Sequence, residues 1–179
     1  MNVFILFARL LKWFYGYEAI NILFRITPSR YTISILRHFG ANIGKDVRIQ
    51  SPFMIHNADQ TEPIYSNLKI GNDCYIGRDC LFDLMGKISI GNKVTISHRA
   101  LFNSHTDAGN SPISKTTLKP SKGEIVIEDG VYLGTGVTIL ENVRICNYSI
   151  IGAFSLVNKS IPGNNTAFGV PCKVRENNK

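Results

Sequence analysis

The four histidines are the side chains best suited to proton transfer, because an ordinary imidazole pKa near 6.5 lets it take and return a proton at neutral pH. They are His38, His56, His98 and His105. Only His105 follows a point where a regular sequence repeat is interrupted, so we interpret it as the candidate general base. His98 is the third residue of a repeat unit, an outward-facing place, and we expect a solvated or structural role. No partner for His38 or His56 is identified by spacing.

Asp83 is the second candidate for chemistry. It lies where the repeat spacing changes from six to eight, so two residues should bulge outward beside it. A carboxylate near His105 would orient the ring, stabilise the imidazolium form or hold a reacting group. Alternatively, Asp83 satisfies the backbone of the bulge. Asn103 and Asp107 flank His105 and are lower-ranked candidates for holding the reacting group.

The cysteines do not predict a metal site. Cys74, Cys80, Cys146 and Cys172 contain no close pair, and no histidine stands at a matching distance. Cys74 and Cys80 occupy the fifth place of consecutive repeat units, where small residues pack inward, so we expect inert core thiols. This usage is typical of a reducing, cytoplasmic compartment.

The element that must position these groups is a repeat with a period of six. Residues 127–162 read as six hexads: IEDGVY, LGTGVT, ILENVR, ICNYSI, IGAFSL and VNKSIP. Aliphatic residues open them: Ile127, Leu133, Ile139, Ile145, Ile151 and Val157. A period of six fits neither a helix nor a strand with one buried face. It predicts a prism-shaped parallel β-helix with openers on the axis, Gly or Asn at the corners, and three hexads in each stacked coil.

The same register extends upstream with interruptions. Further openers are Ile43, Ile49, Ile55, Ile70, Ile76, Phe82, Ile90, Ile96 and Phe102. Residues 103–124 lack aliphatic openers, so we expect a long loop leaving the coil there, and loops of that length are often functional. We therefore divide the chain into a helical extension over 1–38, a β-helix domain over 39–175 and a tail over 176–179.

The hexads, the excursion beginning FNSHTD and the ending IPGNNTAFGVPCKV together resemble the hexapeptide-repeat acyltransferases. The resemblance covers roughly residues 40–175 and points to the branch of galactoside, maltose and polysaccharide O-acetyltransferases. It implies an all-β fold, a single-stranded left-handed parallel β-helix. It also implies a homotrimer with acyl-CoA in the grooves between chains.

The resemblance further implies transfer of an acetyl group from acetyl-CoA to a sugar hydroxyl, in surface polysaccharide biosynthesis, with His105 as base and no metal. Asp83 aligns with a polar family residue, often asparagine, that binds the saccharide acceptor. The family's CoA contacts carry over onto Gly134, Thr135, Ala153, Asn158, Lys159, Lys173 and Arg175. Lys173 replaces a usual arginine, and a lysine contact is less directional.

Other activities remain open at this point. An amino group on a nucleotide-linked sugar would use the same base, which makes an N-acetyltransferase the main alternative. A carbonic-anhydrase-like zinc hydrolase on the same prism needs three histidines meeting at a subunit interface, and His105 has no close second histidine. A non-catalytic trimeric scaffold would have no use for His105.

Residues 1–38 are crowded with apolar and aromatic side chains, yet no uncharged run reaches the ~20 residues that span a bilayer. We expect one or two helices before Pro28 and another over 31–38. They either cap the prism or lie on a membrane surface with Trp13, Tyr15 and Tyr17 at headgroup depth. The second interpretation gives a peripheral contact of residues 1–26 with the cytoplasmic face of the inner membrane.

The charge distribution bears on that choice. The formal net charge is +7, and residues 1–48 carry seven basic side chains against two acidic ones. An anionic lipid surface or an anionic lipid-linked substrate fits this bias. Nucleic acid fits the sign as well, but no recognised binding motif accompanies the charge, so we do not expect a nucleic-acid partner.

Overall fold

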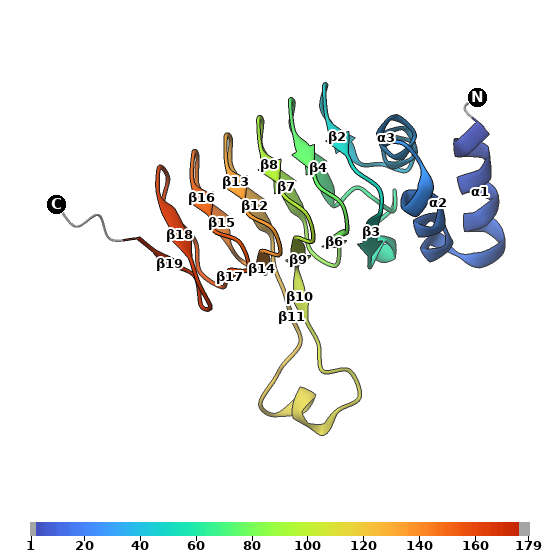
Figure 1. The fold of residues 1–179 in the computed structure, drawn as a ribbon. Coiled ribbons are helices and arrows are strands. Elements are labelled where there is room, and N and C mark those ends of the chain that lie inside the picture. The colour runs from blue at the N-terminus through green and yellow to red at the C-terminus, as the bar shows by residue number, and fades with distance from the viewer. Residues whose placement is uncertain (1–2, 176–179) are drawn as a thin grey trace.

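The computed structural model describes residues 3–175, so the tail at 176–179 and the first two residues lie outside the described part. Figure 1 shows a stack of parallel strands wound as a prism, with helices at one end and a hairpin projecting from its middle. The prism is the parallel β-helix that the period of six predicts.

The amino-terminal helices stand at the end of the coil, with α1 outermost (Figure 1). They are α1 (Val3–Tyr15), the 3-10 helix η1 (Tyr17–Ile20), α2 (Asn21–Ile26) and α3 (Ser29–His38). Pro28 fixes the start of α3 two residues before the predicted boundary, because proline is favourable where a helix begins. Within residues 3–175, no helix combines the length and apolar character needed to cross a membrane.

Strands from successive coils form three parallel faces. The first face holds β1 (Asn42–Ile43), β4 (Leu68–Ile70), β7 (Ile88–Ile90), β12 (Ile125–Ile127) and β15 (Arg144–Ile145). The second holds β2 (Arg48–Ile49), β5 (Tyr75–Ile76), β8 (Thr95–Ile96), β13 (Tyr132–Leu133), β16 (Ile150–Ile151), β18 (Thr166–Phe168) and the antiparallel β19 (Lys173–Val174). The third holds β3 (Phe53–His56), β6 (Cys80–Asp83), β9 (Leu101–Asn103), β14 (Thr138–Leu140) and β17 (Leu156–Val157).

The register of the ladder confirms three hexads in each coil. Ile127 pairs with Ile145, eighteen residues later, and Ile139 pairs with Val157 in the same way. All predicted openers are buried and form one apolar column along the axis. Aromatic rings of successive coils also contact each other in this column: the ring centroids of Phe82 and Phe102 lie 4.3 Å apart, with the ring planes inclined by 54°. Each coil therefore buries its apolar row against its neighbours.

The prediction that Gly or Asn takes the corners for positive φ is confirmed at Gly130, Gly136, Asn142 and Asn164 but is wrong at the other corners of the hexads. The fourth place of the hexad takes positive φ, and there the chain has Asp73 (φ 56°), Lys93 (φ 54°) and Phe154 (φ 56°), for example. The second-place glycines serve another purpose. A Cβ on Gly71 would lie 2.5 Å from the carbonyl oxygen of Gly91, and one on Gly134 would lie 2.6 Å from the amide nitrogen of Ala153. Glycine is required because neighbouring coils approach backbone to backbone.

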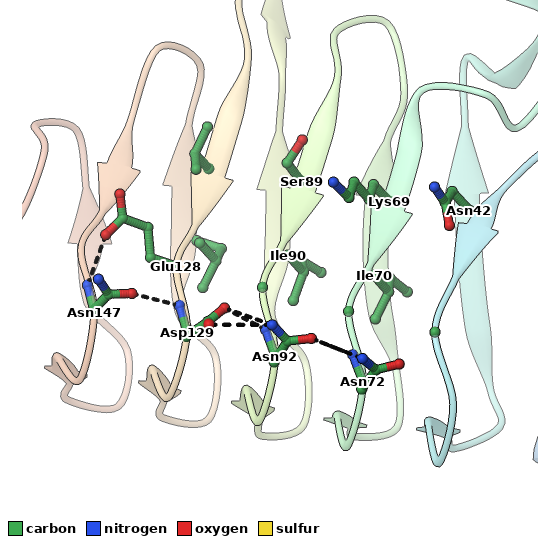
Figure 2. A pocket seen from close by; sticks show the side chains of 15 residues that line it. Asn42, Lys69, Ile70, Asn72, Ser89, Ile90, Asn92, Glu128, Asp129 and Asn147 are labelled. Carbon is green, nitrogen blue, oxygen red and sulfur yellow. Dashed lines mark hydrogen bonds between the residues drawn. The ribbon is translucent and has the colours of Figure 1, made fainter.

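A ladder of polar side chains at the third place of the hexad ties the coils together along one edge (Figure 2). Asn92 Oδ1 accepts the backbone N–H of Asn72 at 2.9 Å, and Asp129 Oδ1 accepts that of Asn92 at 2.7 Å. Asn147 Oδ1 accepts the N–H of Asp129 at 2.9 Å. These oxygens line an open groove of about 540 Å³ and are used in holding the backbone.

The excursion after Phe102 leaves the coil as predicted but carries structure that the sequence did not reveal. Asn103 still belongs to β9. β10 (His105–Thr106) and β11 (Ser121–Lys122) then form an antiparallel hairpin stem, with a 3-10 helix, η3 (Pro112–Lys115), at its tip. The stem fixes the direction in which His105 leaves the coil.

The helices α2 and α3 cover the open end of the first coil. The ring of Phe24 lies 6.2 Å from that of Phe53 and 6.0 Å from that of Tyr65, all three buried. Asn21 receives the N–H of Ile55 at 3.0 Å and donates to its carbonyl at 2.8 Å, which satisfies an exposed strand edge. The inward-facing side chains of α2 and α3, such as Leu23, Phe24 and Ile35, thus belong to the core of the described structure.

Candidate active site

His105 and Asp83 meet at the edge between the third and first faces. Asp83 ends β6, and His105 begins the hairpin one coil later. His105 Nδ1 lies 2.6 Å from Asp83 Oδ2, and the two side chains are 25% and 4% exposed, respectively. A partly exposed imidazole backed by a buried carboxylate is the arrangement found where histidine moves protons.

The surroundings of Asp83 keep it ionised. Burial acts to raise the pKa of this carboxyl, but donors from Asn57, His105 and Ser104 outweigh it and hold the pKa below its ordinary value. Asn57 Nδ2 donates to Oδ1 at 2.6 Å, and the Ser104 backbone N–H donates to Oδ2 at 3.0 Å. The N–H of Met85 also reaches Oδ1, at 3.3 Å. Hydrogen bonds to the charged form lower a carboxyl pKa in this way.

An ionised Asp83 determines the tautomer of His105. A carboxylate only accepts, so Nδ1 must carry the proton and donate it to Oδ2. The lone pair is then on Nε2, which no described residue contacts by a hydrogen bond. The exposed nitrogen of the ring is therefore the basic one.

The hairpin stem builds an open pocket of about 290 Å³ around His105. Its wall is made by Met85, His105, Thr106, Asp107, Pro120, Ser121 and Lys122. Glu141 of the next coil anchors both strands of the stem: its Oε1 accepts from Thr106 Oγ1 at 3.1 Å and from Ser121 Oγ at 2.9 Å. One carboxylate therefore holds the two walls of the pocket in place.

The structure gives different surroundings to the three residues that were candidates for binding the acceptor. Asp107 lines the pocket with His105, although its Oδ1 also accepts the N–H of Gly109 at 2.7 Å. Asn103 lies in β9 and donates to the carbonyl of His105 at 2.9 Å, so it fixes the backbone of the hairpin. Asp83 is buried with both oxygens occupied, which favours the ring-orienting role over direct contact with an acceptor.

The residues considered for the donor fall on different edges of the prism. Gly134 and Thr135 lie between β13 and β14, and Ala153 lies one coil further on the same edge between the second and third faces. Lys173 is in β19 on the second face, and Arg175 follows that strand. Asn158 and Lys159 follow β17 and share the His105 edge two coils on.

His98, Cys74 and Cys80 were expected to have solvated or structural roles, and they occupy exposed or buried structural positions. His98 is exposed, and its Nδ1 accepts the N–H of Arg78 at 3.0 Å. Cys74 and Cys80 are buried free thiols, as predicted, and burial raises the pKa of Cys80 to about 11. Among residues 3–175 there is no cluster of three His, Cys, Asp or Glu side chains arranged to hold a metal ion.

Three residues of the site were missed from the sequence. Ser104 directly precedes His105, so its contact with Asp83 follows once the two strands are paired. Asn57 lies twenty-six residues before Asp83, in a coil whose register has an irregular spacing. Glu141 is a third-place residue like many others, and only the folded hairpin distinguishes it. Each of these contacts crosses between coils, which hexad spacing alone does not reveal.

Comparison with known proteins finds acetyltransferases among the relatives of this chain. The family model for the bacterial transferase hexapeptide (six repeats) matches residues 124–159. The chain is 32% identical over 161 residues to the galactoside O-acetyltransferase of Lactococcus lactis subsp. lactis (strain IL1403), covering 84% of this chain and 69% of that protein. It is 32% identical over 145 residues to the putative colanic acid biosynthesis acetyltransferase WcaF of Escherichia coli (strain K12), covering 81% and 74%.

A solved structure agrees in fold. The hexapeptide-repeat-containing acetyltransferase from Vibrio cholerae O1 biovar eltor, complexed with acetyl coenzyme A, has a TM-score of 0.74 and 22% identity, covering 87% of this chain and 81% of that one. The family model and the two relatives place this three-faced coil among the hexapeptide-repeat transferases. The chain belongs to the hexapeptide-repeat acetyltransferase family.

Proposed function

We propose that this acetyltransferase moves an acetyl group from acetyl-CoA to a sugar hydroxyl during assembly of a surface polysaccharide. The observation that carries the proposal is the His105–Asp83 pair at the wall of an open pocket. The names of the two relatives above, a galactoside O-acetyltransferase and a colanic acid biosynthesis acetyltransferase, support the acceptor and the setting. The acetyl coenzyme A complex of the Vibrio cholerae relative supports the donor.

In the proposed mechanism, His105 Nε2 takes the proton of the acceptor hydroxyl as its oxygen attacks the thioester carbonyl. The buried Asp83 carboxylate stabilises the imidazolium that forms, which lowers the barrier for proton transfer. When the tetrahedral intermediate collapses, the carbon–sulfur bond breaks and the CoA thiolate recovers the proton from Nε2. The products are the acetyl ester and CoA with a free thiol.

The carbonyl oxygen needs a hydrogen-bond donor during this step, and a backbone N–H of the Gly134–Thr135 segment is the proposed one. In one chain that edge is separated from His105 by the width of the third face, roughly 10 to 20 Å for a short strand and its corners. A neighbouring subunit must then supply the donor edge. We therefore propose a homotrimer of left-handed coils with acetyl-CoA bound between chains.

In that arrangement Thr135 and Ala153 of one chain lie along the pantetheine arm. The exposed cations Lys159, Lys173 and Arg175 are proposed to meet the CoA phosphates. An amino acceptor would be served by the same base, but the named relatives favour a hydroxyl. Free cysteines suit a cytoplasmic enzyme, where acetyl-CoA is made and used.

The test is CoA thiol release with a panel of sugar acceptors. His105→Ala should lower turnover by roughly 10² to 10⁴ with CoA binding unchanged, because only the base is lost. His38→Ala is the matched control, since His38 is exposed at the end of α3. If His105→Ala and wild type turned over equally fast, the proposed mechanism would be wrong.

A further inference from the structure

The outermost helix, α1, presents apolar side chains on two opposite sides. Phe4, Ala8 and Leu11 pack inward; Phe4 stacks on Tyr31 of α3 with ring centroids 4.2 Å apart. The other stripe recurs at spacings of three and four and faces solvent. We define this α1 outer face as Val3, Leu6, Phe7, Leu10, Trp13 and Phe14, which are 42–77% exposed. Six large apolar side chains in one exposed stripe mark an interaction surface.

The face continues onto neighbouring elements. Tyr15, at the end of α1, and Ile22 and Ile26 of α2 are also largely exposed. Tyr17 does not have the exposure expected of a side chain at headgroup depth. It is only partly exposed, and burial together with Glu18 and Asp59 raises the pKa of its hydroxyl. Of the three aromatic residues expected at headgroup depth, Trp13 and Tyr15 are therefore the exposed ones.

Basic side chains border the face. Residues 3–38 contain five basic residues and one acidic residue, Glu18. Arg9 is exposed and forms no ion pair with any described residue. A cavity of about 690 Å³ lies beside it, lined by Leu6, Arg9, Leu10, Lys12, Trp13 and Phe39. This cavity combines apolar walls with two cations, although Lys12 also lies 3.6 Å from Glu62.

The charges decide what covers the face. A second copy of the same face would bring Arg9 and Lys12 against like charges. An anionic phospholipid surface offers acyl chains to the apolar stripe and phosphates to the cations, and tryptophan and tyrosine favour that boundary. We propose that the α1 outer face docks the enzyme on an anionic membrane, with a lipid phosphate between Arg9 and Lys12.

The position of α1 also sets the orientation. It is the outermost element at one end of the coil, so docking stands the coil axis upright on the membrane (Figure 1). His105 follows the third coil, two strand spacings beyond the first, and the helical layers add their thickness. This places the active site roughly 30 Å from the lipid surface. A parallel trimer would present three α1 faces at the same end.

The first test is sedimentation of the full-length protein with vesicles of phosphatidylcholine alone or mixed with phosphatidylglycerol. Wild type should bind the mixed vesicles and bind phosphatidylcholine alone at least about tenfold more weakly. Trp13→Ser with Phe14→Ser should lower binding to the mixed vesicles by about tenfold or more, because two inserting rings are lost. Both side chains are exposed, so the fold should survive. Tyr148→Ser, at a 65% exposed ring on the coil, is the matched control.

The second test concerns charge. Arg9→Glu should weaken binding to the mixed vesicles by more than about fivefold, and Lys93→Glu, an exposed corner residue, should not. Equal binding by wild type and the Trp13/Phe14 variant, or no binding by wild type, would overturn the proposal. A changed solution mass for that variant would instead show that the face lies between subunits. Thiol release with a soluble acceptor is measured separately, so failure of the proposed reaction remains distinguishable.

Discussion

Asp83 gives the site a pH dependence that exposed carboxylates lack. Its pKa lies below the ordinary 3.8 despite burial, because donors favour the charged form. A depressed folded-state pKa contributes stability that is fully present above the ordinary value and is lost as pH falls through the lowered one. We expect the melting temperature of wild type to fall over that acid range, and Asp83→Asn to show less of this fall.

The measurement is thermal unfolding across the acid range for wild type, Asp83→Asn and a control. Asp46→Asn is suitable, since Asp46 is an exposed corner residue with φ 54°, a conformation that asparagine accepts. The control should retain the dependence of wild type. Parallel curves for Asp83→Asn and wild type would mean that the carboxyl is not stabilised in its charged form.

At the scale of single residues, the candidate base and its carboxylate could be predicted from the sequence, but the residues that hold the carboxylate could not. His105 and Asp83 stand out because each interrupts a regular repeat. Asn57 and Ser104, which hold the carboxylate, carry no such mark. Their contacts depend on which residues of successive coils are neighbours. That register becomes visible only when the irregular spacings from Ile55 to Ile70 and from Phe82 to Ile90 are resolved.

The hairpin of β10 and β11 depends on one residue of the following coil. Glu141 bonds Thr106 and Ser121, the two walls of the pocket, while its Oε2 is buried without a partner among the described residues. We expect Glu141→Ala to lower kcat by about 10 to 100-fold, because a base displaced by about 1 Å loses its alignment. Glu141→Gln keeps an accepting oxygen and should recover most of the rate.

The measurement for Glu141 separates positioning from general instability. Steady-state kinetics on the folded variants should show the loss in kcat, with CoA affinity and melting temperature little changed. A loss confined to CoA affinity would place Glu141 at the donor site. Equal loss in Glu141→Ala and Glu141→Gln would mean that the charge, and not the hydrogen bonds, is what matters.

The elements of the coil were predictable because their rule is local. An aliphatic opener every six residues is readable from the chain alone, and Ile127, Leu133 and Ile139 all point to the axis. The role of the second-place glycines was misjudged because the tight contact of Gly71 with Gly91 is made with another coil. The hairpin was missed for the same reason, since its anchor lies twenty residues beyond Ser121.

At the scale of the whole molecule, the separation of His105 from the donor edge predicts that each active site uses two chains. His105→Ala and Ala153→Trp should each be inactive alone, the first lacking the base and the second blocking the thioester. Mixed trimers pair an intact His105 with an intact donor edge across some interfaces. Random mixing should restore about a quarter of wild-type turnover.

The experiment is co-expression of the two variants followed by purification and thiol release. Light scattering should give a mass three times the 20.0 kDa of one chain. Mixing the variants after separate assembly is the control and should restore nothing unless subunits exchange. Failure of co-expressed chains to recover activity would place donor and base within a single chain.

The eighteen-residue step between paired strands has a consequence for how this protein can change in size. Inserting or deleting a number of residues that is not a multiple of six would turn every later opener away from the axis, and one that is not a multiple of eighteen would move every later strand to another face, unless the surplus is expelled as an excursion. The length of the described coil is therefore quantised. Variation during evolution or design is then confined to two forms. Whole turns can be added or removed, which moves His105 along the axis, and loops can project outward, which reshapes its pocket.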